Sequence, residues 1–181
     1  MTIFGNSKIK DQAHSLYVEI VNQARQPFLF KRFGVPDTVD GRFDMISLHV
    51  FLVLKRLKGE GKELESLSQC LFDTMFADMD RSLREMGVGD LGVGKRVKAM
   101  IKAFYGRLSA YEKAMSDQDP NSLSKAILRN VFRGDMESIE GAEKITSYIN
   151  VFYSKLLKLS AETLINGKLP VLDEIENVSL R

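Results

Sequence analysis

The sequence has one cysteine and two histidines in 181 residues, which limits the chemistry that its side chains can perform. Cys70 has no partner for an internal disulfide, so we expect a protein of a reducing compartment. Together with His14 and His49 it also gives too few ligands for a closed zinc site of the Cys/His type. A di-iron site in a helical bundle needs two Glu-x-x-His pairs, and one similar spacing, Asp11 to His14, does not supply them. We therefore expect neither a metal nor another cofactor.

The sequence also lacks a long hydrophobic run. Its longest apolar stretch, residues 45–54, is interrupted by Ser47 and His49 and falls short of the ~20 residues that cross a bilayer. Residues 1–12 contain no apolar segment typical of a secretory signal. These two absences predict a soluble protein without a transmembrane segment, which could still work beside a membrane.

The composition favours helices throughout. The chain has four prolines and no tryptophan, is rich in Leu, Lys, Glu and Met, and has no β-rich run. A net charge of +2, with positive and negative residues interleaved, gives no basis for direct nucleic-acid binding. The length fits one domain with a sizeable core. We predict an all-α fold, a single compact bundle of about six helices within one domain, residues 1–181.

Apolar residues recur at helical spacing in six segments, and Gly, Pro and Asn separate them. The predicted helices are 8–24 with Ser7 as N-cap, 37 or 40 to 58, 64–86, 90 or 94 to 115, 122–132 and 140–164. The second is apolar on nearly all sides over residues 45–57, so we expect it at the centre of the bundle. Phe28, Phe30 and Phe33, in the connector before it, are expected to fill the core. Residues 168–181 are predicted to be a short mobile tail.

Four glycines within eight residues separate the third and fourth predicted helices: Gly87, Gly89, Gly92 and Gly94. The first three match G-x-G-x-x-G, and the stretch from the second to Lys95 matches G-x-x-x-x-G-K. Both nucleotide-binding patterns need a preceding strand. The preceding segment has helical spacing instead, and Arg96 stands where a phosphate-binding loop has Ser or Thr. We therefore interpret the glycines as a corner that ends one helix and lets the next cross closely.

Three carboxylates gather near the end of the third predicted helix: Asp73, Asp78 and Asp80. Such a cluster is typical of isoprenoid synthases, which bind Mg²⁺-pyrophosphate, but those enzymes use two aspartate-rich helices and this chain has one cluster. The alternative is salt bridging within the helix, from Asp78 to Arg81 and from Asp80 to Arg84. We favour salt bridging.

The glycine corner is acidic before the glycines and basic after them. Cations such as Lys95 and Arg96 at a helix start oppose the helix macrodipole, so their placement needs another reason. They could pair with the carboxylates of the preceding helix or meet an external partner. Exposed ion pairs contribute at most about 1 kcal/mol each and suit orientation or recognition better than stability. The residues alone therefore predict an all-α recognition domain.

Three stretches around these features resemble a known family: Leu16–Phe30, Phe33–Leu57 and Leu71–Tyr111. The sequence is similar there to the ubiquinol–cytochrome c chaperone family, over roughly residues 14–165. The resemblance implies an all-helical, non-enzymatic chaperone that binds newly made cytochrome b and promotes assembly of ubiquinol–cytochrome c reductase. Mitochondrial members carry an N-terminal targeting sequence and act at the ribosomal exit with a small partner protein. No such targeting sequence is found here, so the resemblance implies a bacterial form, cytoplasmic and peripheral to the inner membrane.

Beside this resemblance, two alternatives stay open: a Mg²⁺-dependent isoprenoid-type enzyme that uses the carboxylate cluster, or a general helical adaptor. We expect no catalytic residue. The contact surface for a partner is predicted at the corner and its flanks, with residues Arg42, Asp44, Asp73, Asp78, Asp80, Gly87, Gly89, Asp90, Gly92, Gly94, Lys95 and Arg96.

Overall fold

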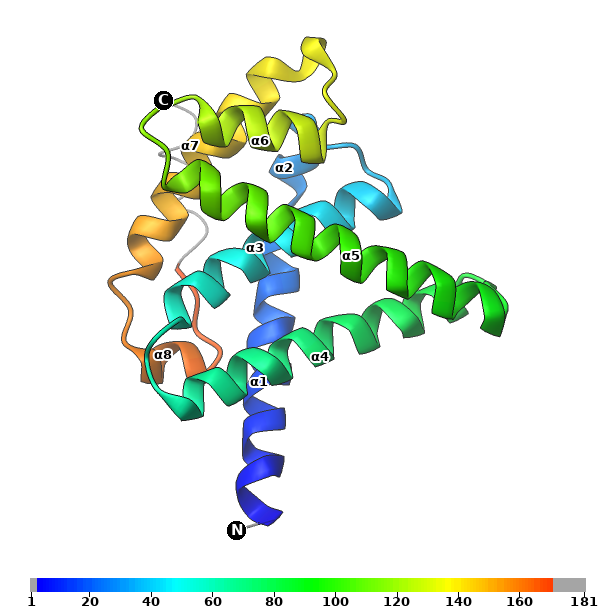
Figure 1. The fold of residues 1–181 in the computed structure, drawn as a ribbon, viewed down its shortest axis with the longest axis vertical. Coiled ribbons are helices and arrows are strands. Elements are labelled where there is room, and N and C mark those ends of the chain that lie inside the picture. Colours follow the sequence, from blue (N-terminus) through cyan, green and yellow to red (C-terminus); the bar gives the residue numbers. More distant parts are fainter. Residues whose placement is uncertain (1–2, 171–181) are drawn as a thin grey trace.

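The computed structural model describes residues 3–170, and all regular structure within them is helical (Figure 1). The helices are α1 (Ile3–Ala24), α2 (Pro27–Lys31), α3 (Val39–Leu57), α4 (Lys62–Glu85), α5 (Asp90–Met115), α6 (Ser122–Val131), the 3-10 helix η1 (Met136–Ser138), α7 (Ile139–Leu156) and α8 (Ala161–Ile165). The prediction of an all-α fold is confirmed. No helix of this described part is both long and apolar enough to cross a membrane. The predicted mobile tail lies outside the described residues from residue 171 onward.

Helix α3 lies at the centre of the bundle. It packs against α1, α4, α5, α6 and α7, and most of its residues are buried. An apolar stripe confined to one face would need a neighbour on that face alone, whereas a helix that is apolar all round needs neighbours on every side. The prediction of a nearly all-apolar central helix is therefore confirmed.

The connector before α3 supplies core side chains, as predicted. Phe28 and Phe33 are buried, and each ring meets Tyr148 of α7 edge-on, with the centroids of Phe28 and Tyr148 5.7 Å apart. Phe30 is half-buried against the same core. The short helix α2 within this connector was not predicted. It begins at Pro27, whose ring favours the first position of a helix.

Two predicted helix boundaries were wrong. Helix α1 begins at Ile3, so Ser7 lies inside the helix and is not its N-cap. The single helix predicted over 140–164 is two helices, because α7 ends at Leu156 and α8 begins only at Ala161. The hydroxyl of Ser160 accepts a hydrogen bond from the Thr163 amide at 3.1 Å, and this N-cap starts a new helix where the apolar spacing suggested continuity.

A buried carboxylate joins α3 to two other parts of the chain. Asp44 is fully buried, and its oxygens lie 2.5 Å from Nη2 of Arg107 in α5 and 2.8 Å from Nη1 of Arg133, just after α6. Burial raises the pKa of the Asp44 carboxyl, and the two guanidinium groups oppose that rise. The Arg107 guanidinium also stands over the Phe43 ring, 5.4 Å from its centroid. This double ion pair fixes α5 and the α6–α7 turn relative to α3.

His49 is the second buried polar group of α3. Its Nδ1 lies 2.8 Å from the Met45 carbonyl oxygen, and its Nε2 lies 2.7 Å from the Tyr148 hydroxyl. A carbonyl oxygen can only accept, so Nδ1 carries the proton and Nε2 accepts from Tyr148. Both ring nitrogens of this buried histidine therefore have a partner. Burial lowers the pKa of His49 to about 4.

We predict that Asp44→Asn lowers the free energy of unfolding by about 3 kcal/mol, because it leaves the largely buried Arg107 charge uncompensated. Urea denaturation at neutral pH measures this change. Asp37→Asn is the matched control, since the Asp37–Arg42 pair is exposed on both sides and should contribute less than about 1 kcal/mol. An equally small effect of both substitutions would show that the buried pair does not stabilise the fold.

We also predict that His49 makes the fold sensitive to acid. Between pH 6.5 and about 4 the unfolded chain binds a proton at this residue and the native protein does not, so stability falls as the pH falls. The full difference between the pKa values of His49 in the unfolded and native states corresponds to about 3 kcal/mol of unfolding free energy. The measurement is the urea midpoint of the wild type and of His49→Gln at pH 7 and at pH 4.5. We expect the midpoint to fall less between these two pH values in the variant than in the wild type. His14→Gln, which replaces the exposed second histidine, should retain the wild-type slope, and a retained slope in His49→Gln would contradict the prediction.

Candidate functional site

The glycine corner joins α4 to α5, as predicted, and in Figure 1 it lies at the edge of the molecule, far from α7 and α8. Gly87 has a φ of 82°, which favours glycine, and its amide donates to the Arg84 carbonyl at 2.9 Å. The next amide, of Val88, donates to the Leu83 carbonyl at 3.1 Å, which completes the end of α4. The corner therefore ends a helix, and the helix α4 stands where a nucleotide-binding motif would need a strand.

The other three glycines of the corner have no such conformational reason. Gly89 precedes α5, while Gly92 and Gly94 lie in its first turns with ordinary helical backbone. No atom lies within 4 Å of the position that a Cβ of Gly94 would take. Glycine at such helical positions costs roughly 0.5–1 kcal/mol relative to alanine. Gly92 and Gly94 therefore leave two positions in the first turns of α5 without a side chain.

Ion pairs within α4 engage two of the three predicted carboxylates. Asp80 lies 2.6 Å from Nε of Arg84, and Asp78 lies 2.6 Å from Nη2 of Arg81, so both predicted pairs are confirmed. Arg84 also pairs with Asp90 at the start of α5. One arginine thus links the two helices across the corner.

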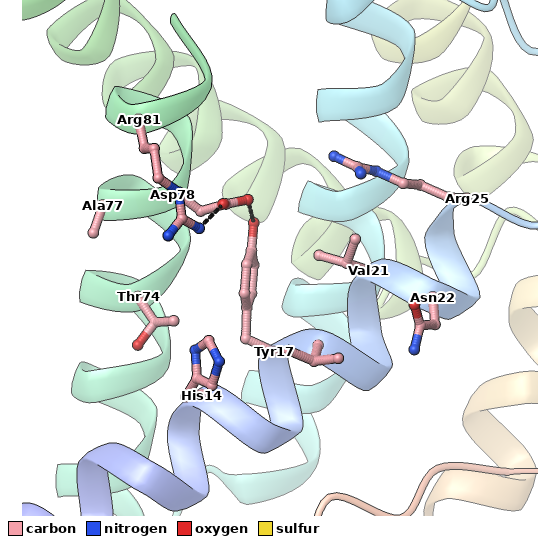
Figure 2. Close-up of a pocket in the computed structure, with 10 residues that line it drawn as sticks. His14, Tyr17, Val21, Asn22, Arg25, Thr74, Ala77, Asp78 and Arg81 are labelled. Atoms are coloured by element: carbon pink, nitrogen blue, oxygen red, sulfur yellow. Dashed lines mark hydrogen bonds and ion pairs between the residues drawn. The ribbon is translucent and has the colours of Figure 1, made fainter. Parts of the chain in front are cut away.

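Asp78 faces a different part of the molecule from Asp80. Figure 2 shows Asp78 and Arg81 of α4 opposite Tyr17 and Arg25 of α1, around a cavity of about 350 Å³. The Tyr17 hydroxyl donates to Asp78 Oδ2 at 2.9 Å, and burial together with this carboxylate raises the pKa of Tyr17. Asp78 is therefore part of the α1–α4 packing.

The three predicted carboxylates do not form one site. Asp73 is exposed and accepts from Gln69 at 3.0 Å, Asp78 bonds to α1, and Asp80 bonds to Arg84. Among the described residues, no group of three or more His, Cys, Asp or Glu side chains is placed to hold a metal ion. The geometry gives a pyrophosphate-bound Mg²⁺ no common carboxylate face on α4.

A groove opens between the corner and the start of α3, and we call it the corner groove. It consists of a hollow of about 770 Å³ and an adjoining one of about 290 Å³, which share Val39 and Met86. Its further lining residues include Arg42, Met79, Gly87, Gly89, Arg96 and Met100. Val39 and Met86 are each about half exposed, at 51% and 52%. Thioether side chains are flexible and polarizable, so a surface with three of them can adapt to apolar partners of different shape.

The predicted site residues are distributed over several surfaces. Arg42 of α3 and Arg96 of α5 line the corner groove, as do Gly87 and Gly89. Asp44 has no exposed surface, so it offers a partner no direct contact, contrary to the expectation.

Lys95 and Arg96 are neighbours in sequence but occupy different faces of α5. Successive residues of a helix are about 100° apart, and only Arg96 lines the corner groove. Neither side chain forms an ion pair with any other residue that the structure describes, because the α4 carboxylates pair with α4 arginines. Of the two reasons considered for these cations, pairing with the preceding helix does not hold.

Sequence reasoning did not find Val39, Met86 and Met100 as groove residues. The sequence pattern singled out none of these three apolar residues as exposed. Exposure of an apolar side chain depends on which helices cover it, and the only local signal was the position of Val39 and Met86 at helix ends.

The chain was compared with known proteins. The family model described as "Ubiquinol-cytochrome C chaperone" matches residues 31–172. The chain is 24% identical to the ubiquinol-cytochrome-c reductase complex assembly factor 1 of Xenopus laevis, over 87% of this chain and 78% of that protein. It is 27% identical to the factor of the same name in Mus musculus, again over 87% of this chain, but it spans only 53% of the mouse protein.

Its fold matches a solved structure along nearly its whole length. The crystal structure of the Cbp3 homolog from Brucella abortus superposes with a TM-score of 0.82 at 39% sequence identity, covering 95% of this chain and 94% of that one. The likeness thus extends from the family model to the spatial arrangement of the helices. The chain belongs to the ubiquinol-cytochrome C chaperone family.

Proposed function

We propose that this protein is a non-enzymatic chaperone that binds newly made cytochrome b and promotes the assembly of ubiquinol–cytochrome c reductase. Membership of the family carries the proposal, since the family is described as a chaperone and the animal relatives are named as assembly factors of that complex. A small partner protein and the ribosome belong to the same proposal, as does a location in the cytoplasm at the face of the inner membrane. No cofactor is required for this role.

The corner groove is our candidate for the client site. A chaperone of a membrane protein must cover apolar segments before they assemble, and the groove offers half-exposed Val39 and Met86 with Met79 and Met100 behind them. Arg42 and Arg96 line the groove together with Asp40 and Glu85, and these charges would give such a segment a fixed orientation through complementary charges.

Two alternatives to the chaperone are less well supported. An isoprenoid-type enzyme would need carboxylates that converge on one cation, and Asp73, Asp78 and Asp80 point to different partners. A general helical adaptor would use the same groove but would bind partners other than cytochrome b. Co-purification from native cells in mild detergent distinguishes the chaperone from the adaptor, since a chaperone enriches cytochrome b without the assembled complex.

We predict that Arg96→Glu weakens recovery of cytochrome b roughly tenfold, because it reverses the charge at the rim of the groove. The measurement is detergent co-purification with the tagged protein, quantified by mass spectrometry. Arg96 is exposed and forms no ion pair with the residues that the structure describes, so the variant should melt close to the wild-type temperature. A loss of binding then reports on the contact surface and not on folding.

Lys62→Glu is the matched control. It makes the same charge reversal at an exposed lysine near the start of another helix, α4, and does not line the groove. We expect it to retain cytochrome b. If Arg96→Glu binds cytochrome b normally, the groove is not the client site. If the wild type recovers no cytochrome b at all, the chaperone proposal itself fails and the adaptor becomes the better hypothesis.

A further inference from the structure

One face of α5 carries a line of exposed side chains that the groove does not use. Residues 91, 95, 98, 102 and 105 follow one another in steps of four and three, which places them along one side of a helix. They are Leu91, Lys95, Lys98, Lys102 and Tyr105, and we call them the α5 stripe. All five are exposed, and Leu91 is exposed to 97%, which is unusual for a leucine in a folded chain.

The three lysines of the stripe have no counter-charge within the described residues, where none of them forms an ion pair. The acidic residues of α5 are Asp90, which pairs with Arg84, and Glu112, which pairs with Lys55 and Lys58. The stripe therefore presents uncompensated positive charge to the solvent. Three adjacent lysines repel one another, so their placement along one line suits an anionic surface outside the molecule.

Both ends of the stripe are apolar. Leu91 lies at the glycine corner, which Figure 1 shows at the edge of the molecule. Tyr105 is 56% exposed, and its ring is held against Phe72 and Phe104, with centroids 5.6 Å and 5.9 Å away. A tyrosine fixed at the surface with its ring half exposed suits the headgroup level of a bilayer, where such amphipathic rings gather.

We propose that the α5 stripe docks on an anionic lipid bilayer, with Leu91 inserted at the boundary of the acyl chains and the lysines among the headgroups. A basic face with apolar anchors is the pattern of helices that lie in the plane of a membrane surface. A nucleic acid would also attract the lysines, but a fully exposed leucine gains nothing from a phosphate backbone and gains free energy on leaving water in a bilayer. The lipid surface therefore explains both the charge and the leucine.

Docking through the stripe leaves the corner groove free, because Arg96 lies about 100° round the helix from Lys95. The inference deepens the proposed location at the inner membrane by naming the surface that faces the lipid. Its test uses vesicles without any client protein, so failure of lipid docking and failure of cytochrome b binding are separate results.

The test is flotation of the full chain with phosphatidylcholine vesicles, with and without phosphatidylglycerol. We expect flotation with the anionic vesicles only, and weaker flotation at high salt. The triple variant Lys95→Gln, Lys98→Gln, Lys102→Gln should partition roughly a hundredfold less, because each lysine near an anionic surface contributes roughly a fivefold gain. The matched control replaces Lys8, Lys10 and Lys62 by glutamine, which removes the same charge from the starts of α1 and α4. We expect that control to float like the wild type.

The absence of tryptophan in the chain gives a second, independent measurement. Leu91→Trp introduces a single fluorophore at the proposed insertion point, and its emission should shift to the blue when anionic vesicles are added. Leu157→Trp, at a half-exposed position between α7 and α8, should not shift.

Two results would overturn the proposal. One is a wild type that ignores anionic vesicles, including the case in which it binds a structured RNA through the same lysines. The other is equal loss of flotation in the stripe variant and its control, which would show that flotation depends on net charge and not on the α5 stripe.

Discussion

The buried carboxylate of Asp44 is the interaction on which the arrangement of the helices depends. Its two oxygens meet Arg107 and Arg133, which come from α5 and from the α6–α7 turn. A buried charge without a partner is costly, so each helix can take only positions that keep both contacts. Because Asp44 lies on the central helix, this one requirement fixes α5, and α5 in turn carries one wall of the corner groove and the whole α5 stripe.

The two surfaces follow from the way α5 leaves the core. Near the start of α5 Val93 is buried, whereas Leu91, Lys95 and Arg96 are exposed, so residues on both sides of the helix remain accessible there. The side of α5 turned toward α3 carries Arg96 and lines the corner groove together with Met86 at the end of α4. The side turned away carries the lysines of the α5 stripe. A chaperone of a membrane protein needs a place for its client close to a place for the lipid, and under our two proposals the two faces of this one helix would serve these purposes.

Much of the fold could be predicted from the sequence because its signals are local. The apolar residues of 45–57 face every direction, which predicted the central position of α3, and spacings of three and four residues predicted the pairs Asp78–Arg81 and Asp80–Arg84. The partners of Asp44 lie far along the chain, in other helices, so its burial could not be predicted from its neighbours. The same holds for Tyr17, which bonds to Asp78 from another helix.

The candidate site was predicted in part. The corner was located by its glycines, but its lining depended on the packing of α3 beside α4, which brings Val39 next to Met86. Helical periodicity alone places Lys95 and Arg96 on different faces of α5. Which of them faces a groove and which faces solvent depends on where the core lies, and only the packed structure determines that.

The start of α5 departs from local preferences at several positions. Gly92 and Gly94 weaken the helix there, Lys95, Arg96 and Lys98 lie toward its positive end without ion pairs among the described residues, and Leu91 is almost fully exposed. Each of these features costs free energy in the isolated protein, and no contact inside the described fold offsets the cost. A natural chain tends to depart from local rules where a partner supplies the missing interactions. Anionic lipid at the stripe and an apolar client at the groove would supply them, since the first neutralises the lysines and covers Leu91 while the second covers Met86.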